Sequence, residues 1–451
     1  MPELRPYQKE DVLFLEKLDA VGIFNEMRTG KTPTALMTLV RKKCSKNIIV
    51  APASTLYQWK EEYERWTNQP CIILAGTPKK VDKAISEWTH GAVISYDLFK
   101  DTSSRVGKVH QILKAKPDAI VLDEAHKIKN PKTDVSKSVF LCTKIPVRLA
   151  LTGTPAPNKP HEIYSILHFL KPETYKSYWG FIDNYFYKYN SYGNGRTFLE
   201  VGSFKRGKEL ELQKILAEFC TSRKRKDVMQ WLPEKDYIDV KLDVTKEQSK
   251  YLNELAKYFE TEHIITQGIL DRLMRYRQIC LDPEILELKG KSPKFEYITQ
   301  YIKDNPNEPI LIFSKFNSFL YKLEKFYNKN CRIINGTTTS KERNQIKGDF
   351  QKGKFDILLL QIDATKEGLT LDRAETIIFA DKYPPVSDLQ QAEDRFVATT
   401  EARKNKPHTV ISLMMKDTYD EVIEHMIKER KSETDIINNF KEFIKRSEID
   451  V

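Results

Sequence analysis

Three short motifs, each placed directly after an apolar run, constrain the fold of this chain more than any other feature. They read Met-Arg-Thr-Gly-Lys-Thr at residues 27–32, Asp-Glu-Ala-His at residues 123–126 and Thr-Gly-Thr-Pro at residues 152–155. The short apolar runs at residues 119–122 and 147–151 are typical of buried parallel strands. Because ligands bind at the carboxyl ends of strands in open α/β sheets, we expect the motifs to meet at one edge of one sheet.

The first motif predicts a site for the phosphates of ATP. A glycine-containing turn that opens a helix lets backbone N–H groups surround a triphosphate. The Lys31 ammonium is then expected near the β- and γ-phosphates, and the Thr32 hydroxyl on Mg²⁺. The remaining residues assigned to this phosphate loop are Met27, Arg28, Thr29 and Gly30.

The second motif predicts hydrolysis of the bound nucleotide. Asp123 is expected to hold the metal, directly or through water, while Glu124 orients and deprotonates the attacking water. Alone, an Asp-Glu-Ala-His string is often a strand end with a solvated acidic loop. Its order and spacing relative to the other two motifs favour the catalytic interpretation.

The length of 451 residues suits two or three compact domains. Two successive alternations of strands and helices predict two doubly wound parallel sheets, with strands near residues 47–50, 71–74, 92–94, 119–122 and 147–151, and then near 309–313, 331–334, 355–360, 376–380 and 409–413. We expect a first lobe at residues 1–228, with a helical insertion at about 160–226 that contains a turn or small hairpin near 190–196. A hinge at 229–236 is followed by a second lobe at 237–451, with a helical insertion at about 245–290 and a C-terminal helix at about 418–451.

Composition narrows the class of protein. The formal charge of +11 favours a polyanionic partner, although a generally basic surface is the alternative. Six well-separated cysteines without a Cys-x-x-Cys pair are expected to be buried thiols rather than zinc ligands or disulfides. The chain has neither an apolar run of membrane-spanning length nor an apolar signal core, so we expect a cytoplasmic protein without a membrane partner.

These motifs resemble those of superfamily-two helicases of the Swi/Snf type, the double-stranded DNA translocases that include chromatin remodellers and compact phage and bacterial members. Leu-Arg-Pro-Tyr-Gln at residues 4–8 and Gln-Ala-Glu-Asp-Arg at residues 391–395 carry the resemblance most clearly, and it covers nearly the whole chain. It implies two RecA-like lobes that face a nucleotide cleft, ATP and Mg²⁺ as cofactors, and movement along duplex DNA without sequence specificity. The small size suggests a phage or bacterial source, and we expect a monomer.

The resemblance also implies roles for individual residues. Arg5, Gln8, Gly368 and Arg403 are assigned to the nucleotide, with Gln8 on the adenine base, while Gln391 and Arg395 approach the phosphates from the second lobe. The implied DNA contacts are Ser54, Gln58, Trp59, Ser95, Tyr96, Ser314, Lys315, Asn335, Gly336, Thr337 and Thr365.

Three positions depart from the family pattern. Arg28 stands where glycine is usual, which predicts either a strained or a relaxed loop, and Asn25 stands where aspartate is usual. Ala398 occupies the place of the arginine finger, for which Arg403 is the nearest replacement.

Two surface features keep two interpretations each. The aromatic residues from Tyr175 to Tyr192 favour packing in a helical hairpin over a stacking platform for bases. The basic pairs near Lys205 and Arg223 are expected either to follow a DNA backbone or to be solvated helix ends.

Overall fold

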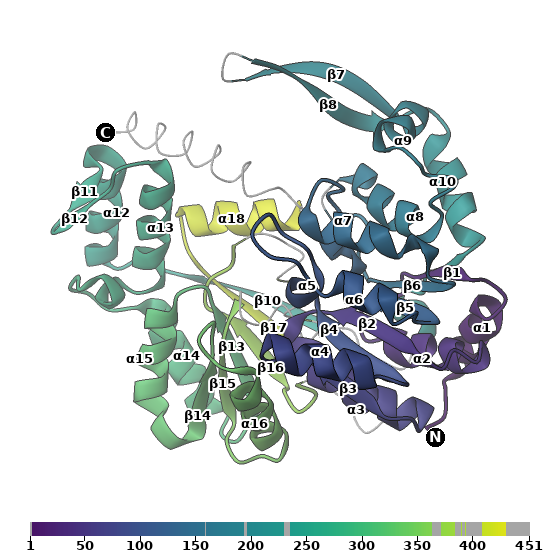
Figure 1. Ribbon diagram of the computed structural model, residues 1–451. Helices are drawn as coiled ribbons and strands as arrows, with labels where there is room; N and C mark the ends of the chain where they lie inside the picture. The colour runs from purple at the N-terminus through teal and green to yellow at the C-terminus, as the bar shows by residue number, and fades with distance from the viewer. Residues whose placement is uncertain are drawn as a thin grey trace. The chain divides into compact units, whose positions relative to one another are not determined.

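The computed structural model describes residues 2–157, 159–193, 196–229, 235–362, 371–383, 389, 393 and 408–429. The chain forms two compact units that divide between residues 230 and 231, and each is described separately below (Figure 1). Within the described ranges, no helix is both long and apolar enough to cross a membrane.

The first unit is built on a seven-stranded parallel sheet with the strand order β3-β4-β2-β5-β6-β1-β9. Three of the central strands are buried along their whole length, as expected for a sheet covered on both faces. The strands are β1 (Ala20–Ile23), β2 (Asn47–Ala51), β3 (Cys71–Leu74), β4 (Gly91–Ser95), β5 (Ala119–Leu122), β6 (Val147–Leu151) and β9 (Cys220–Thr221).

Alternate residues of each strand enter two different cores. Ile49 and Val121 pack against α1, α2 and α3, whereas Ile48 and Ile120 pack with residues of α4 to α10 on the opposite face. This arrangement confirms the doubly wound α/β fold. The helices are α1 (Pro6–Leu15), α2 (Lys31–Arg41), α3 (Leu56–Thr67), α4 (Pro78–Glu87), α5 (Tyr96–Phe99), α6 (Val109–Lys114), α7 (Asp134–Phe140), α8 (Tyr164–Leu170), α9 (Tyr178–Tyr185), α10 (Lys208–Ala217) and α11 (Arg225–Val228).

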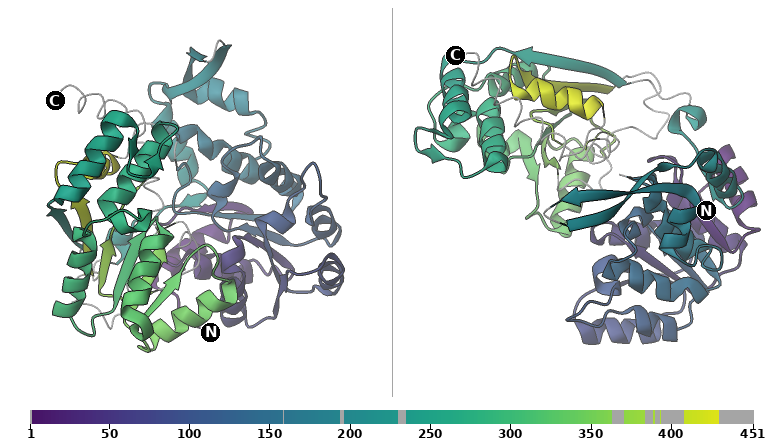
Figure 2. Two further views of the ribbon diagram at one scale, coloured as in Figure 1. Left: turned by 90° about the vertical axis from the view of Figure 1, so that its left-hand side faces the viewer. Right: turned by 90° about the horizontal axis from the view of Figure 1, so that it is seen from above.

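The insertion after β6 contains more β-structure than the sequence predicted. Strands β7 (Phe186–Gly193) and β8 (Arg196–Phe204) form a long antiparallel hairpin that extends away from the body of its unit (Figures 1 and 2). Alternating aromatic, β-branched and polar residues explain why this segment is extended rather than helical. Tyr175, Phe181 and Tyr185 are buried, which confirms the packing interpretation for them, whereas Tyr187 and Tyr189 are exposed on the hairpin.

The second unit contains a six-stranded parallel sheet with the order β10-β17-β16-β13-β15-β14. Its strands are β10 (Lys235–Leu242), β13 (Ile310–Ser314), β14 (Cys331–Ile334), β15 (Ile357–Gln361), β16 (Thr376–Phe379) and β17 (His408–Met415). Its helices are α12 (Lys246–Tyr258), α13 (Ile269–Leu281), α14 (Pro293–Asp304), α15 (Asn317–Tyr327), α16 (Ser340–Gln351) and α18 (Tyr419–Lys428).

Side chains on the two faces of this sheet also pack into two different cores. Leu311 and Leu358 belong to a core with α12, α13, α16 and α18, while Ile310 and Ile357 belong to a core with α14 and α15. The short hairpin of β11 (Glu260–Thr261) and β12 (Ile264–Ile265) joins α12 to α13. All six cysteines are free; five are buried and Cys44 is partly exposed.

Candidate nucleotide site

The order of the first sheet brings the three motifs together. Strand β6 lies between β5 and β1, with Leu151 opposite Ile23 and Ala150 opposite Leu122. The segments that follow these three strands are the phosphate loop, the acidic pair and the Thr-Gly-Thr-Pro motif. They therefore meet at the carboxyl edge of one sheet, where open α/β folds bind ligands.

The phosphate loop has a backbone shape that few residues adopt. Gly30 caps α2 with a φ of 81°, and a Cβ there would lie only 2.1 Å from Nε2 of Gln8. Arg28 also has a positive φ, 67°, so the loop has the strained form and not the relaxed one. Lys31 Nζ donates to the carbonyl oxygens of Asn25, at 3.0 Å, and Glu26, at 3.3 Å. The ammonium group is thus held at the start of the loop.

Side chains of helix α1 form hydrogen bonds with the same loop. Tyr7 Oη donates to the Thr29 carbonyl at 2.7 Å, and Gln8 Nε2 donates to the same oxygen at 3.1 Å. Gln8 Oε1 in turn accepts from the backbone N–H of Arg5 at 2.9 Å. Gln8 was assigned to the adenine base, but here its amide braces the backbone of the phosphate loop.

A buried polar network explains the asparagine at position 25. Asn25 Nδ2 donates to Asp11 at 2.9 Å, and Asn25 Oδ1 accepts from the backbone N–H of Arg223 at the same distance. The Arg223 guanidinium also donates to Asp11, at 2.9 Å. An aspartate at 25 would place two buried carboxylates in contact, which is costly. Arg223 is therefore a structural residue, a role that the basic run at 223–226 did not reveal.

Asp123 is held by two aromatic side chains that were expected to contact DNA. Trp59 Nε1 donates to its carboxylate at 2.7 Å, and Tyr96 Oη donates to its backbone carbonyl at 2.7 Å. Trp59 and Tyr96 are 3% and 5% exposed. In this structure both side chains position the acidic motif, and their assignment to DNA stays a prediction from the sequence. Ser95 caps α5 by accepting from the N–H of Leu98.

The acidic pair suits a divalent cation. Burial of the carboxylate is the largest cause, and repulsion from Glu124 the second, that raises the pKa of Asp123 to about 6. The hydrogen bond from the Trp59 N–H lowers this pKa and so opposes both. A bound cation relieves this repulsion. Mg²⁺ commonly takes one or two carboxylates together with phosphates and water, and Asp123 supplies one carboxylate. Among the described residues, no group of three or more His, Cys, Asp or Glu side chains is placed to hold a metal ion.

Glu124 is linked to the third motif through a histidine. Its backbone is left-handed, with a φ of 48°, and its Oε2 lies 3.3 Å from His126 Nδ1. The same nitrogen lies 3.1 Å from Thr152 Oγ1, which also accepts from the N–H of Thr154. A Cβ on Gly153 would lie 3.6 Å from Lys31 Nζ, so this motif approaches the phosphate loop. The candidate base, its histidine neighbour and the third motif thus form one connected group.

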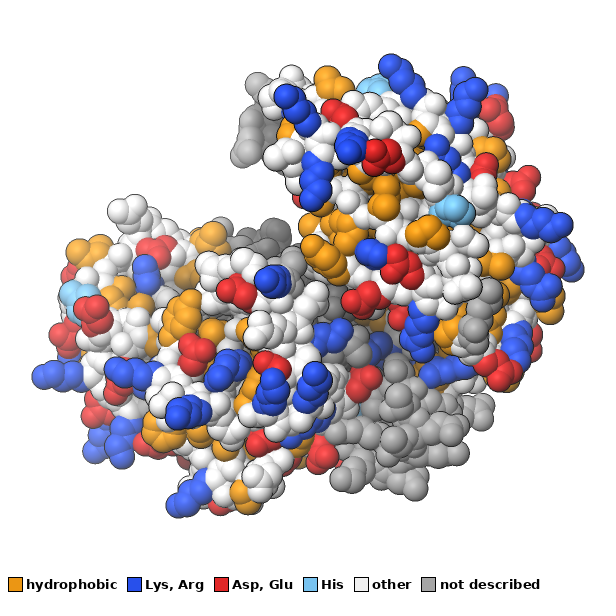
Figure 3. Space-filling view, turned by 60° about the horizontal axis from the view of Figure 1, so that its bottom comes forward, with side chains coloured by type: hydrophobic (Ala, Val, Ile, Leu, Met, Phe, Trp, Pro, Cys, Tyr) orange, Lys and Arg blue, Asp and Glu red, His pale blue; other side chains and the backbone are white. Residues whose placement is uncertain are grey.

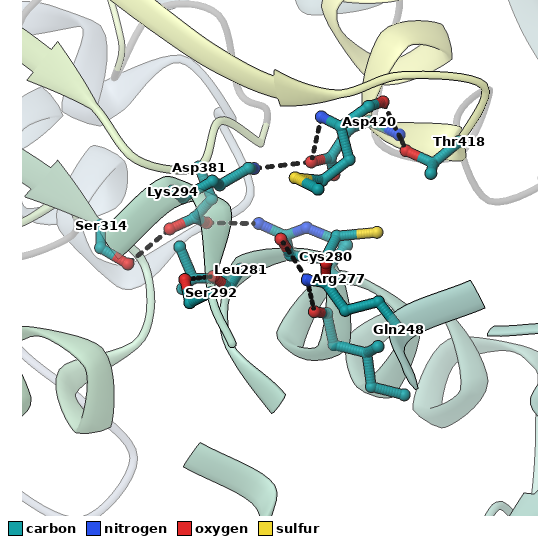
Figure 4. Close-up of polar contacts among 12 residues, drawn as sticks. Gln248, Arg277, Cys280, Leu281, Ser292, Lys294, Ser314, Asp381, Thr418 and Asp420 are labelled. Carbon is teal, nitrogen blue, oxygen red and sulfur yellow. Dashed lines mark hydrogen bonds and ion pairs between the residues drawn. The ribbon is translucent and has the colours of Figure 1, made fainter. Parts of the chain in front are cut away.

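In the second unit, Ser314 belongs to a buried ion-pair network and not to an exposed surface (Figure 4). Its hydroxyl donates to Asp381 Oδ1, which also accepts from the N–H of Lys315. The other oxygen of Asp381 accepts from Arg277 at 2.9 Å, and the guanidinium lies 4.2 Å from the centre of the Tyr383 ring. The Ser314 side chain thus connects β13 to Asp381 and, through it, to α13, and its assignment to DNA stays a prediction from the sequence.

Breaking the Arg277–Asp381 pair is expected to destabilise the second unit. Arg277→Met leaves a carboxylate that is 4% exposed without its charged partner, at a cost of about 3–5 kcal/mol. Asp381→Asn is expected to have a similar effect, and the double variant to lose less than the sum. Hydrogen exchange at the amides of α13 and β16 measures the change. The matched control is the exposed pair Lys416–Asp243, whose disruption should cost below about 1 kcal/mol; equal effects at the two pairs would contradict this account.

The remaining predicted DNA contacts differ in exposure. Asn335 is buried, and its side-chain oxygen Oδ1 accepts from Thr337 Oγ1 at 2.8 Å, so Asn335 shapes the turn after β14. Gly336 and Thr337 are exposed on that turn, as is Gln58 in the first unit, while Ser54 and Lys315 are partly exposed. Basic and acidic side chains are interspersed on the face drawn in Figure 3. Five assigned site residues lie outside the described residues: Thr365, Gly368, Gln391, Arg395 and Arg403, as does Ala398.

Comparison with known proteins decides the family. The profile of the SNF2-related domain matches residues 7–285, which is more than half of the chain, and that of the helicase conserved C-terminal domain matches residues 293–397. The chain belongs to the SNF2 family. The site described above lies within the SNF2-related domain.

Several curated members of the SNF2 family are similar over most of the chain. The mouse SWI/SNF-related matrix-associated actin-dependent regulator of chromatin subfamily A member 1 is 28% identical over 93% of the chain and 42% of that protein. The yeast ISWI chromatin-remodeling complex ATPase ISW1 is 26% identical over 87% and 37%. A Bacillus subtilis protein, whose name describes an ATP-dependent helicase/translocase, is 26% identical over 96% and 48%. The chain therefore spans less than half the length of these relatives.

Among solved structures, the SWI2/SNF2 ATPase core of Sulfolobus solfataricus in complex with double-stranded DNA is 24% identical, with a TM-score of 0.43. The match covers 95% of this chain and 91% of that one.

Two residues of α1 that support the nucleotide site were not assigned to it from the sequence. Asp11 and Tyr7 reach the phosphate-loop network from α1. Their spacing of four places both on the helix face that carries Gln8, and this periodicity is the signal that would have identified them. Arg223 had no such signal, because its contacts join segments 212 residues apart.

Proposed function

We propose that the protein hydrolyses ATP with Mg²⁺ and uses the energy to move along double-stranded DNA or to remodel protein–DNA complexes. The observation that carries this proposal is the convergence of the phosphate loop, the acidic pair and the third motif on strands β1, β5 and β6. Membership in the SNF2 family supports the choice of DNA as substrate, and the names of the mouse and yeast relatives, which refer to chromatin, support protein–DNA complexes.

The residues divide the chemistry between them. Lys31 and the backbone of the loop bind phosphate, Thr32 and Asp123 hold Mg²⁺, and Glu124 accepts the proton of the attacking water. The cation supplies neutralisation of charge on the phosphates when it is bound. Gln391 and Arg395 are proposed to complete the site.

The DNA contacts are proposed to position the duplex without reading its sequence. Gly336 and Thr337 are exposed on the turn after β14, Ser54 is partly exposed in a short 3₁₀ helix (Ala53–Thr55), and Gln58 is exposed near the start of α3. Their side chains carry hydroxyl and amide groups, except for that of Gly336. Such groups bind phosphates, which carry no sequence information. A monomeric state and a cytoplasmic location in a bacterial or phage-infected cell remain predictions from the sequence.

Nucleic-acid dependence of ATP turnover tests the proposal. We expect duplex DNA to stimulate hydrolysis more than single-stranded DNA or RNA of the same length. Duplex affinity should fall steeply between about 50 and 200 mM salt and vary little with sequence, because counterion release dominates binding to phosphates. Preferential stimulation by single strands would favour a strand-separating helicase. Duplex binding without stimulated turnover would favour a nucleic-acid-binding scaffold with weak ATPase activity, which the alanine at 398 motivates.

A further inference from the structure

A cavity of about 750 Å³ lies in the first unit among α1, the ends of β1 and β9, and α10 (α1, β1 and α10 are labelled in Figure 1). We infer that it is a second ligand site, for an uncharged planar molecule with one hydrogen-bonding group. Its volume falls in the range of about 300–1,000 Å³ that is typical of small-molecule sites. The lining includes Gly153 and Pro155 of the third motif, so the cavity borders the nucleotide site, but it includes none of residues 27–32 of the phosphate loop, all of which the structure describes.

The wall of this cavity is mainly apolar. Its apolar lining consists of Phe14, Phe24, Pro155, Leu216, Ala217 and Cys220. A Cβ on Gly22 would lie 2.5 Å from Cys220 Sγ and 2.7 Å from the Phe24 ring, so the glycine lets both side chains pack over β1. Rings and alkyl groups from three elements therefore offer a flat, apolar ligand contacts on several sides.

Among the described residues that line the cavity, Thr221 offers a ligand a buried polar group, whereas the other uncharged polar lining residues, Gln213 and Ser222, are exposed to solvent. The Thr221 hydroxyl lines the cavity, its residue is 7% exposed, and its oxygen has no hydrogen-bond partner among the described residues. A buried hydroxyl without a partner is unfavourable, and a ligand N–H or O–H would satisfy it.

Four of the five charged lining residues are already paired with the protein, and the fifth, Lys224, is exposed to solvent. Asp11 and Arg223 form an ion pair at 2.8 Å, and the Glu26 carboxylate accepts from the backbone N–H of Arg225 at 2.7 Å. A charged ligand would have to compete with these pairs or enter an apolar space without a counter-charge. The observations therefore favour a neutral ligand, which separates this site chemically from one for a triphosphate.

The cavity is connected to the nucleotide site. Glu26 lines the cavity, its carbonyl accepts from Lys31 at 3.3 Å, and its backbone N–H donates to the Arg223 carbonyl at 2.9 Å. A ligand that packs against this segment also contacts the backbone that holds the phosphate-loop lysine. Occupancy of the cavity is therefore expected to change nucleotide affinity, and nucleotide to change ligand affinity by the same factor.

Indole and indene form a matched pair of probes for this site. They have nearly the same shape, but only indole carries an N–H that can donate to Thr221 Oγ1. Ligand-observed NMR titration of the nucleotide-free protein should show saturable binding of both, with indole binding about 5–10-fold more tightly. Thr221→Val should remove that difference by weakening indole alone.

Two substitutions on α10 locate the binding. Ala217→Trp adds bulk to the cavity wall and should abolish binding of both probes. Leu210→Trp places the same side chain at a position that is 64% exposed and outside the lining, so both probes should still bind. Absence of saturable binding, or unchanged binding to the Ala217→Trp variant, would overturn the inference. Competitive displacement of indole by ADP would also overturn it, because the cavity would then be part of the nucleotide site. These measurements require no ATP hydrolysis, so they stand apart from the proposed function.

Discussion

Replacing Glu124 with Gln is expected to slow ATP hydrolysis by about 10²–10⁴-fold, while nucleotide affinity stays close to that of the unmodified protein. The amide keeps the size of the carboxylate beside His126 but cannot accept a proton from water. ATP should therefore remain bound and unhydrolysed. Single-turnover phosphate release, combined with equilibrium binding of a fluorescent ATP analogue, separates the two effects.

Lys31→Ala is the companion variant, with a different expected result. It removes the ammonium that is held beside the loop by the carbonyls of Asn25 and Glu26, so both binding and hydrolysis should be lost. Loss of a charge-assisted contact to phosphate predicts a fall in affinity of about 10–100-fold. The exposed Lys17 provides a control, since Lys17→Ala should change neither quantity. If both site variants lost equal nucleotide affinity, the separate roles of Lys31 and Glu124 would be contradicted.

Removing the arginine that substitutes for the finger missing at Ala398 should lower DNA-stimulated turnover by about 10³–10⁵-fold. Because an arginine that neutralises charge on the transferred phosphoryl group accelerates hydrolysis so strongly, we expect an active motor to have one. We propose that Arg395 acts together with Arg403, which follows Ala398 by five residues in the sequence. Arg28 is the other candidate, because it belongs to the phosphate loop.

Turnover in three variants distinguishes these arginines. Arg395→Ala and Arg403→Ala should both be strongly impaired, whereas Arg28→Gly should retain activity. Glycine suits the φ of 67° at position 28, so a loss of activity there would reflect chemistry and not a damaged loop. Impairment of Arg395→Ala alone would show that no substitute finger exists and would favour the weak-ATPase scaffold.

The buried strands were predictable because their apolar runs have no other stable location. The run at 119–122 is β5, and the run at 376–380 contains β16. Strand β10 was not predicted, because it lies at the sheet edge and most of its side chains are exposed. Its alternating polar sequence was therefore assigned in part to the hinge. Strand β9 has only two residues, too few for any periodic signal, and exists because it pairs with β1.

In the nucleotide site, too, the features encoded by local sequence were predicted, and those that depend on residues far apart in the chain were not. Apolar runs followed by short motifs located the loop, the acidic pair and the third motif correctly at strand ends. The direction of individual side chains was not local information. Trp59 turns toward Asp123, which is 64 residues away in the sequence, and Ser314 turns toward Asp381, which is 67 residues away. Only the folded sheet brings these partners together.

Displacement of a third strand from a DNA triplex is the most direct measurement of the central claim. A protein that moves along a duplex dislodges a triplex-forming strand ahead of it without separating the duplex strands. The account predicts ATP-dependent displacement by the unmodified protein, none by the Glu124→Gln variant, and no unwinding of a forked duplex that lacks a third strand. Duplex-stimulated ATP hydrolysis without displacement, or efficient unwinding of the fork, would contradict translocation on double-stranded DNA.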